Sequence, residues 1–239
     1  MSNQTIFLSD IHLCESRPRI IDAFVSFLSK LTNEVDALYI LGDLFEYWIG
    51  DDSRQHENVI KALKKVTNQH IQVFLMHGNR DFLIGSAFEK KTGAVLLNDP
   101  ILVEIYGKKV LLCHGDTLCT DDIEYQSFRD KIRSESWKNE FLKKSLAERV
   151  SIANEFRKES ELNKKKKSVK IMDVNLDEVN RTLIQFNYPD FLIHGHTHRP
   201  NQHSINLDGH QIQRIVLGDW YEQGSYLILS AHGIETCRV

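Results

Sequence analysis

Five short apolar runs, each followed at once by glycine, aspartate or histidine, constrain the fold more than any other feature of this chain. In order they are TIFLSD, ALYILGD, IQVFLMHGN, KVLLCHGD and FLIHGHTH. Apolar runs of this length are typical of buried strands. The polar residues that close each run predict functional groups at the carboxyl ends of the strands.

The segments between these runs indicate how the strands are connected. Apolar residues at helical spacing in residues 20–31 and 57–66 predict a βαβαβ start with parallel pairing and right-handed crossovers. After Gly93, turn signals at Tyr106-Gly107, Asp208-Gly209 and His232-Gly233 predict hairpins and a mixed or antiparallel second half. We therefore expect an α/β (α+β) fold in which residues 1–239, 41% hydrophobic, form one domain.

Residues 121–170 interrupt this scheme with a charged, helix-favouring stretch. We expect an inserted lobe of two short helices, whose large apolar residues are Phe128, Ile132, Trp137, Phe141, Leu142, Leu146, Val150 and Phe156. These side chains either pack the lobe onto itself and the core, or leave an exposed apolar groove.

Composition excludes several classes of protein. A formal net charge of −3 argues against a nucleic-acid binder that works by general phosphate neutralisation. The four cysteines form no CxxC pair, which predicts reduced cytosolic thiols. The chain shows no cleavable signal and no apolar window long enough for a transmembrane helix, so any membrane contact is expected to be peripheral.

The strand ends supply seven candidate metal ligands. Asp10 and His12 are two residues apart, and a period-2 backbone would point both side chains to one side. The same argument applies to His196 and His198, where Gly195 lets the backbone turn closely. The other ligands expected are Asp43, Asn79 and His114.

Any one of these residues could be an ordinary turn residue, but five strand-end motifs in one chain together favour a metal site. Imidazole, carboxylate and amide donors without thiolate suit Mn²⁺, Fe²⁺ or Zn²⁺, and we expect two divalent ions, favouring manganese. Asp43 is the expected bridge between them. His77 and His194 adjoin these motifs, and each could either hydrogen-bond a ligand or simply pack at a strand end.

The ordered set DIH, GDLFEYW, GNRD, HGD and GHTH resembles the calcineurin-like metallophosphoesterases, whose general pattern is DxH, GD, GNHD, a later histidine and GHxH. The longer strings GDLFEYWIGDD, MHGNRDFLIG, LLCHGDTLCTDD, IMDVN, LIHGHTHRP and VLGDW are similar to the UDP-2,3-diacylglucosamine diphosphatases within that superfamily. The resemblance covers nearly the whole chain.

This resemblance implies a β-sandwich flanked by helices. One metal would be held by Asp10, His12, Asp43 and His198, and the other by Asp43, Asn79, His114 and His196. It further implies cleavage of UDP-2,3-diacylglucosamine to UMP and 2,3-diacylglucosamine 1-phosphate, a step toward lipid A in Gram-negative bacteria. The implied location is cytoplasmic, peripheral on the inner membrane, and we expect a monomer.

Arg80 departs from the wider superfamily, where many members have a histidine that can protonate an alcohol leaving group. Arginine cannot act as that acid. A phosphate leaving group, with a second pKa of about 6, needs far less protonation, so Arg80 would hold its developing charge instead. The substitution fits diphosphate cleavage; the alternative is a structural arginine.

Substrate contacts are also implied by the resemblance. They fall on Asn79, Arg80, Asp122, Ser160, Lys164, Lys167 and His196, with Asp43, Arg80 and His196 as the catalytic set. The match at Lys164 could instead fall on Asn163, because residues 164–167 are all lysine. That run could be a solvated face, a phosphate site or an attraction for anionic lipid.

Two other functions stay open. Another nucleotide-diphosphate or dinucleotide hydrolase of the superfamily would share the metal residues without needing an apolar lobe. A non-catalytic scaffold usually loses ligands, whereas all seven positions are filled here.

Overall fold

The computed structural model describes residues 3–166, 171–222 and 224–239. Its strands are β1 (Gln4–Leu8), β2 (Val35–Leu41), β3 (Gln72–Met76), β4 (Val95–Leu97), β5 (Ile101–Ile105), β6 (Lys108–Leu112), β7 (Phe191–His194), β8 (Asn201–Leu207), β9 (His210–Val216), β10 (Ser225–Ser230) and β11 (Gly233–Arg238). Its helices are α1 (Pro18–Ser29), α2 (Glu57–Asn68), α3 (Ser86–Thr92), the 3₁₀ helix η1 (Asp116–Leu118), α4 (Ile123–Arg133), α5 (Glu135–Leu142), α6 (Leu146–Lys166) and α7 (Leu176–Gln185).

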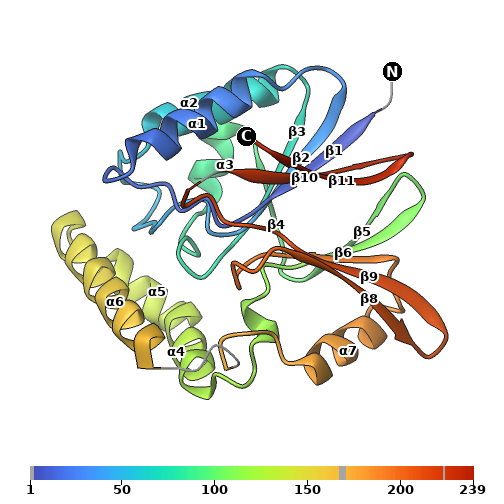
Figure 1. Cartoon of the computed structure of the whole chain (residues 1–239). Coiled ribbons are helices and arrows are strands. Elements are labelled where there is room, and N and C mark those ends of the chain that lie inside the picture. The colour runs from blue at the N-terminus through green and yellow to red at the C-terminus, as the bar shows by residue number, and fades with distance from the viewer. Residues whose placement is uncertain (1–2, 167–170, 223) are drawn as a thin grey trace.

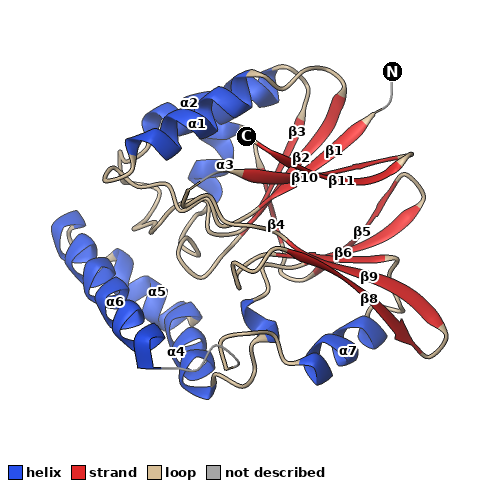
Figure 2. Ribbon diagram, in the orientation of Figure 1, coloured by secondary structure: helices blue, strands red, loops and turns tan. Residues whose placement is uncertain are grey.

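Two mixed sheets face each other in a sandwich with helices on its outer faces (Figures 1 and 2). One sheet has the order β11-β10-β1-β2-β3-β4, and the other β5-β6-β7-β9-β8. Strands β1, β2 and β3 pair in parallel, which confirms the predicted βαβαβ start. The sandwich flanked by helices confirms the predicted fold class.

The central strands β1 and β2 are mostly apolar because both of their faces are covered. In β1, Phe7 belongs to the core between the sheets, whereas Ile6 and Leu8 pack beneath the helices. Helices α1, α2 and α3 cover the first sheet, and α7 covers the second. Helix α7 was not predicted, although Val179 and Leu183 are buried at helical spacing and Asn175 caps its start.

The predicted turns close three hairpins. Tyr106 and Gly107 join β5 to β6 with φ values of 50° and 74°, and Asp208 and Gly209 join β8 to β9 with 51° and 83°. Two successive positive φ values match the twist of antiparallel strands. Strands β10 and β11 form the third hairpin, so the second half is mixed, as predicted. All four cysteines are free thiols, which agrees with the expectation of no disulfide.

Helices α4, α5 and α6 lie together beside the sandwich, and we call them the helical lobe (Figure 1). The expectation of two short helices was wrong: there are three, and α6 spans 21 residues. Aromatic rings hold them together: Phe156 of α6 lies edge-on to Phe128 of α4 at 5.1 Å, and it is 6.0 Å from Trp137 of α5. The aromatic members of the expected set therefore pack on one another, whereas Leu142 and Leu146 are exposed.

Two buried charges fix the lobe to the sandwich. Asp116 in η1 receives hydrogen bonds from Tyr125 and Arg129 of α4. Arg149 of α6, which is buried, donates to the Ile49 carbonyl at 3.0 Å and pairs with Asp52 at 2.7 Å.

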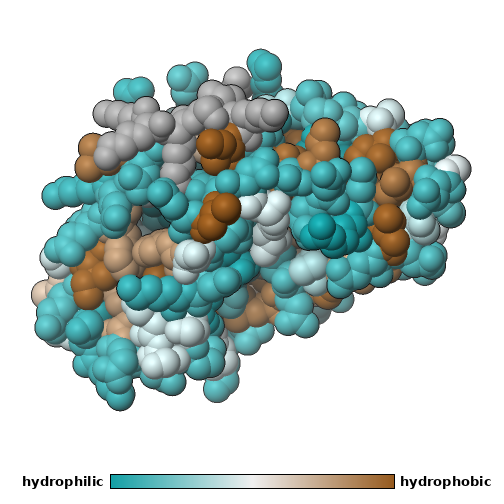
Figure 3. All heavy atoms as spheres, turned by 90° about the horizontal axis from the view of Figure 1, so that it is seen from below, coloured by the Kyte–Doolittle hydropathy of each residue, from teal (hydrophilic) through white to brown (hydrophobic). Residues whose placement is uncertain are grey.

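The underside of the molecule bears separate apolar patches among hydrophilic side chains (Figure 3). Within the described ranges, no helix has both the length and the apolar content needed to cross a bilayer.

Candidate metal centre

All seven predicted ligands lie in loops directly after strands and meet at one edge of the sandwich. Asp10 and His12 follow β1, Asp43 follows β2 and Asn79 follows β3. From the other sheet, His114 follows β6, and His196 and His198 follow β7. Because β1, β2 and β3 are parallel to one another, as are β6 and β7, their carboxyl ends deliver these side chains to the same place.

Asp10, His12 and His198 form what we call the first cluster. The two imidazole Nε2 atoms are 3.2 Å apart. Asp10 Oδ1 lies 3.3 Å from His198 Nε2 and 3.8 Å from His12 Nε2. One donor atom from each of the three residues lies within 4.8 Å of the other two, a spacing that is compatible with one shared cation.

Asn79, His114 and His196, together with Asp43, form the second cluster. Asn79 Oδ1 lies 3.1 Å from His114 Nε2 and 3.0 Å from His196 Nδ1. Asp10, Asp43 and His114 also offer donor atoms within 4.8 Å of one another, so the two clusters are contiguous.

Asp43 lies between the clusters. Its Oδ2 is 3.8 Å from His12 Nε2, and its Oδ1 is 3.9 Å from His114 Nε2, so each carboxylate oxygen faces one cluster. Asp10 Oδ1 is buried and has no hydrogen-bond partner in the part of the chain described here. A buried anionic oxygen without a partner, among nitrogen and oxygen donors, is what a divalent cation would satisfy. The donor set therefore fits the predicted metal.

The backbone explains why ligands two residues apart converge, and it corrects our expectation. Five ligands have left-handed φ values, namely Asp10 (54°), His12 (51°), Asp43 (53°), His196 (67°) and His198 (54°). The period-2 argument was therefore wrong, because these residues lie outside extended strands. Non-glycine residues adopt this conformation rarely and at a cost of about 1–3 kcal/mol each, so their surroundings must hold them there.

Asp81 is one residue that holds these loops, and it was not predicted. It is fully buried and accepts hydrogen bonds from the backbone amides of Gly78 at 2.8 Å and Leu44 at 2.8 Å, with that of Asp43 at 3.3 Å. It thus ties the β2 loop to the β3 loop. Its position two residues after Asn79, in GNRD, was the available signal.

Gly195 permits the contact between the β1 and β7 loops. A Cβ at this position would lie 2.0 Å from Ser9 Oγ and 2.2 Å from Asp10 Oδ2. The same Asp10 oxygen accepts hydrogen bonds from Ser9 Oγ at 2.6 Å and from the His196 amide at 2.8 Å. A residue without a side chain is therefore required here, for contact with the β1 loop.

The electrostatics of the site favour a cation. Burial would raise the pKa of Asp10, but the neighbouring His198, His114 and His12 hold it well below its usual range. Burial, with Asp81 and Asp10 adding to it, raises the pKa of Asp43 to about 7. Several buried carboxylates in contact repel one another, and a divalent ion would relieve this repulsion.

The two adjacent histidines do not hydrogen-bond a ligand side chain. His77 Nε2 lies 2.7 Å from the Ile84 carbonyl. His194 Nδ1 lies 3.0 Å from the Gly195 carbonyl, and its Nε2 is 3.3 Å from Arg214. Both residues therefore organise backbone at strand ends, in line with the packing alternative.

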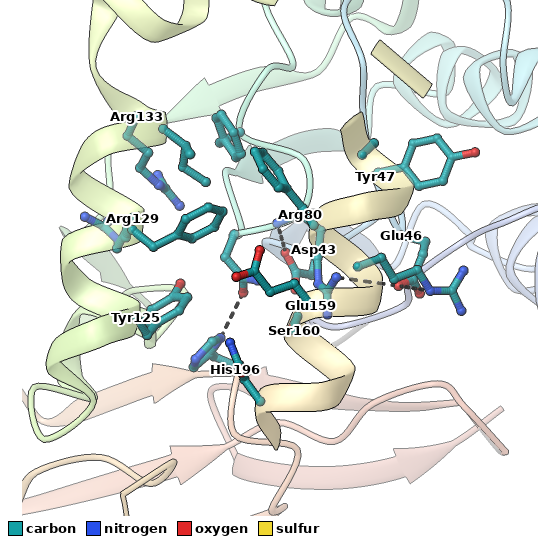
Figure 4. Close-up of a pocket in the computed structure, with 18 of the residues that line it drawn as sticks. Asp43, Glu46, Tyr47, Arg80, Tyr125, Arg129, Arg133, Glu159, Ser160 and His196 are labelled. Atoms are coloured by element: carbon teal, nitrogen blue, oxygen red, sulfur yellow. Dashed lines mark hydrogen bonds and ion pairs between the residues drawn. The ribbon is translucent and has the colours of Figure 1, made fainter. Parts of the chain in front are cut away.

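A pocket of about 660 Å³ opens between this centre and the helical lobe (Figure 4). Ligands at its floor include His12, Asp43, Asn79, His196 and His198. Of the predicted substrate contacts, Arg80, Asp122 and Ser160 line it as well, and so does Asn163, the alternative to Lys164. Lys167 lies outside the described residues, and the side chain of Lys164 is not among those described.

Arg80 lies beside Asp43. Its backbone amide donates to Asp43 Oδ1 at 2.8 Å, and its guanidinium lies 3.9 Å from Glu46 Oε1. Glu46 is buried and also pairs with Arg17 at 2.8 Å and Arg157 of α6 at 3.4 Å. Of these arginines, Arg80 and Arg157 line the pocket, where Glu46 pairs with both, and Arg17 and Arg157 were not predicted.

The opposite wall of the pocket is apolar. The aromatic side chains Phe82, Phe128, Trp137, Phe141 and Phe156 line it, together with Leu83 and Ile132. Tyr125, Arg129 and Arg133 project into the cavity from α4, and Glu159 and Ser160 face them from α6 (Figure 4). One cavity therefore joins a candidate metal centre, cationic side chains and an apolar compartment.

The sandwich gathers seven candidate metal ligands at its strand ends, the arrangement expected of a metal-dependent phosphoesterase. The family model of the calcineurin-like phosphoesterases matches residues 4–200, and the chain belongs to this family. A relative from Aeromonas hydrophila is 48% identical over 94% of this chain and 93% of its own length, and one from Cellvibrio japonicus is 44% identical over 96% of each. Both are named UDP-2,3-diacylglucosamine hydrolase, which agrees with the predicted resemblance.

A solved structure of an archaeal phosphodiesterase matches 99% of each chain with a TM-score of 0.50. At 15% identity this similarity shows the fold alone.

Proposed function

We propose that this chain hydrolyses the diphosphate bond of UDP-2,3-diacylglucosamine and releases UMP and 2,3-diacylglucosamine 1-phosphate, a step of lipid A biosynthesis. The observation that carries the proposal is the single cavity that joins the ligand clusters to an aromatic wall. A substrate with a diphosphate and two acyl chains needs both environments side by side. The names of the relatives support the same substrate.

Two divalent cations, which we propose to be Mn²⁺, would be held in the two clusters with Asp43 shared between them. When bound, such a pair supplies Lewis-acid activation of a water molecule and of the phosphoryl group. Water adds to the α-phosphorus, and the bond from that phosphorus to the bridging oxygen breaks. The bridging oxygen leaves with the sugar phosphate.

Arg80 would stabilise the charge that develops on the leaving phosphate. Its side chain is 14% exposed and borders the cavity beside Asp43, so it is close to the ligands and partly shielded from water. Shielded charges interact strongly with a developing anion. We propose Asn79, Asp122, Ser160, Lys164, Lys167 and His196 as further substrate contacts.

The helical lobe would act as the substrate cap within a single domain, with residues 121–170 as its extent. We propose that the chain acts as a monomer. We further propose peripheral contact with the cytoplasmic face of the inner membrane, because acyl chains reside in a bilayer and residues 164–167 are all lysine.

The test compares UMP release from UDP-2,3-diacylglucosamine and UDP-N-acetylglucosamine with Mn²⁺ present. The value of kcat/KM should be more than about 100-fold higher for the lipid, because each buried methylene contributes about 0.8 kcal/mol. Asp43→Ala should be inactive on both substrates while remaining folded. Equal turnover of the two substrates by the unsubstituted chain would instead indicate a hydrolase of soluble nucleotide diphosphates.

A further inference from the structure

Three consecutive residues after β9 each contact a different ligand of the first cluster. Asp219 Oδ2 lies 3.1 Å from His198 Nδ1. The Trp220 amide donates to the Asp10 carbonyl at 3.1 Å. The Tyr221 ring is stacked on His12, with 5.1 Å between centroids and 13° between planes. We call these residues the 219–221 segment.

The segment is itself held rigidly at its centre. Trp220 is fully buried, with its ring edge-on to Phe24 at 5.7 Å and to Phe27 at 5.8 Å, both from α1. Its indole Nε1 donates to the Ser225 carbonyl at 3.0 Å. The core therefore fixes the backbone from which Asp219 and Tyr221 reach the ligands.

Tyr221 is covered on its other side. The guanidinium carbon of Arg17 lies 4.5 Å from the centre of the Tyr221 ring, so Arg17, Tyr221 and His12 form a stack. Arg17 also donates to the His12 carbonyl. A histidine held by such a stack has little freedom to turn its ring.

The second cluster is supported differently. His114 Nδ1 lies 2.9 Å from the Leu41 carbonyl, a neutral group. In the described ranges, the hydrogen bonds and ring contacts of the 219–221 segment with ligands all go to Asp10, His12 and His198. The segment therefore distinguishes the two clusters.

A carboxylate that accepts the Nδ1–H of a ligand histidine fixes the tautomer that leaves Nε2 free, and it makes that nitrogen a better donor to a cation. In His198 this Nε2 is the atom that faces Asp10 and His12. Loss of such a partner typically weakens metal binding about 10- to 100-fold.

We propose that the 219–221 segment is a positioning element that raises the affinity of the first cluster, and of that cluster alone, for its divalent cation. The inference rests on the proposed metal centre. What it adds is a difference in cation affinity between the two clusters. The residues that set this difference do not bind the ion themselves.

The experiment measures Mn²⁺ binding by equilibrium dialysis with metal analysis. Asp219→Ala is placed in His114→Ala, which leaves the first cluster intact, and in His12→Ala, which leaves the second. We expect affinity to fall about 10- to 100-fold in the first background and by less than about twofold in the second. Asp219→Asn keeps an oxygen acceptor, so its Mn²⁺ affinity should lie between that of Asp219→Ala and that of the parent.

Asp173→Asn is the matched control, because Asp173 pairs with Arg199, next to His198, without contacting a ligand. It should change affinity less than about twofold. Asp219→Ala alone, in the otherwise unsubstituted chain, should bind one Mn²⁺ with unchanged affinity and the other with reduced affinity. This measurement tests the inference even if His114→Ala or His12→Ala fails to fold or to bind Mn²⁺. Equal weakening of both ions, no weakening, or an equal effect of Asp173→Asn would overturn the inference. If the unsubstituted chain bound no Mn²⁺, the proposed metal centre itself would fail.

Discussion

At the scale of single residues, the protonation of the ligands determines how a cation enters each cluster. Burial would lower the pKa of His114, but Asp43 and Asp10 outweigh it and raise the pKa to about 9. In the first cluster, Asp10 and Asp219 likewise outweigh burial and raise the pKa of His198 to about 9. Burial lowers the pKa of the other two ligand histidines, so these are already neutral. Each cluster therefore holds one proton that a cation must displace.

We expect Mn²⁺ binding at about pH 8 to release about one proton per ion, because only a neutral imidazole donates to a metal. Between the Asp43 pKa of about 7 and the histidine pKa of about 9, one proton competes with each ion, so affinity should rise about tenfold per pH unit; below that range Asp43 also takes up a proton and affinity should fall more steeply. Calorimetric titration in buffers of different ionisation enthalpy counts the protons. Binding without proton release would contradict this assignment.

The seven candidate ligands could be picked out because their residue types and strand-end positions are local features of the sequence, and the structure brings them together at one edge. The reason for their convergence could not, since the left-handed backbone at Asp10 and His12 depends on loops from elsewhere in the chain. Asp81 and Asp219 escaped prediction for the same reason. Asp81 reaches Asp43, 38 positions earlier, and Asp219 reaches His198, 21 positions earlier, and no spacing rule connects either pair.

At the scale of elements, helix α4 is attached to the metal-centre loops through one buried carboxylate. Asp116 accepts from Arg129 at 2.7 Å and from Tyr125 at 2.9 Å. Arg133 lies 3.5 Å from the same carboxylate and donates at 2.9 Å to the carbonyl of Gly78, the residue before Asn79. The position of α4 is thus coupled to the loop that carries Asn79.

Asp116→Asn should lower the free energy of unfolding by about 3 kcal/mol, because it leaves two partly buried arginines without their counter-charge. Urea unfolding of the metal-free chain at neutral pH measures the difference. Asp208→Asn is the control: Asp208 also accepts a tyrosine hydroxyl, from Tyr188, but at an exposed site, and its loss should cost less than about 0.5 kcal/mol. Similar losses in the two variants would show that the arginine pairs contribute nothing.

The strands and hairpins were predictable because apolar runs and turn residues such as Asp208-Gly209 act within a few positions. The number of helices in the lobe was not, because α6 has almost no one-sided apolar pattern. It is held instead by Arg149, whose partners Ile49 and Asp52 lie about a hundred residues earlier in the chain. Contacts between residues so far apart in the chain cannot be predicted from local sequence patterns.

At the scale of the whole molecule, the proposed substrate requires contact with a bilayer, although the chain carries a net charge of −3. Attraction must therefore be local. Among the exposed apolar side chains described in and near the lobe, the two most exposed are Ile123 at the start of α4, at 74%, and Leu176 at the start of α7, at 64%. Their segments are joined by a hydrogen bond from Asn175 to Asp121 at 2.7 Å. Both could enter a membrane surface from the same side of the molecule.

We expect the chain to float with vesicles that contain anionic phospholipid. Replacing both side chains, by Ile123→Glu and Leu176→Glu, should reduce binding at least tenfold, because burying each apolar side chain contributes about 1.5–3 kcal/mol. Val95→Glu is the matched control, since Val95 is 49% exposed on β4 of the sandwich and gains the same charge. Binding that resisted the double substitution, or that Val95→Glu weakened equally, would place the membrane contact elsewhere on the molecule.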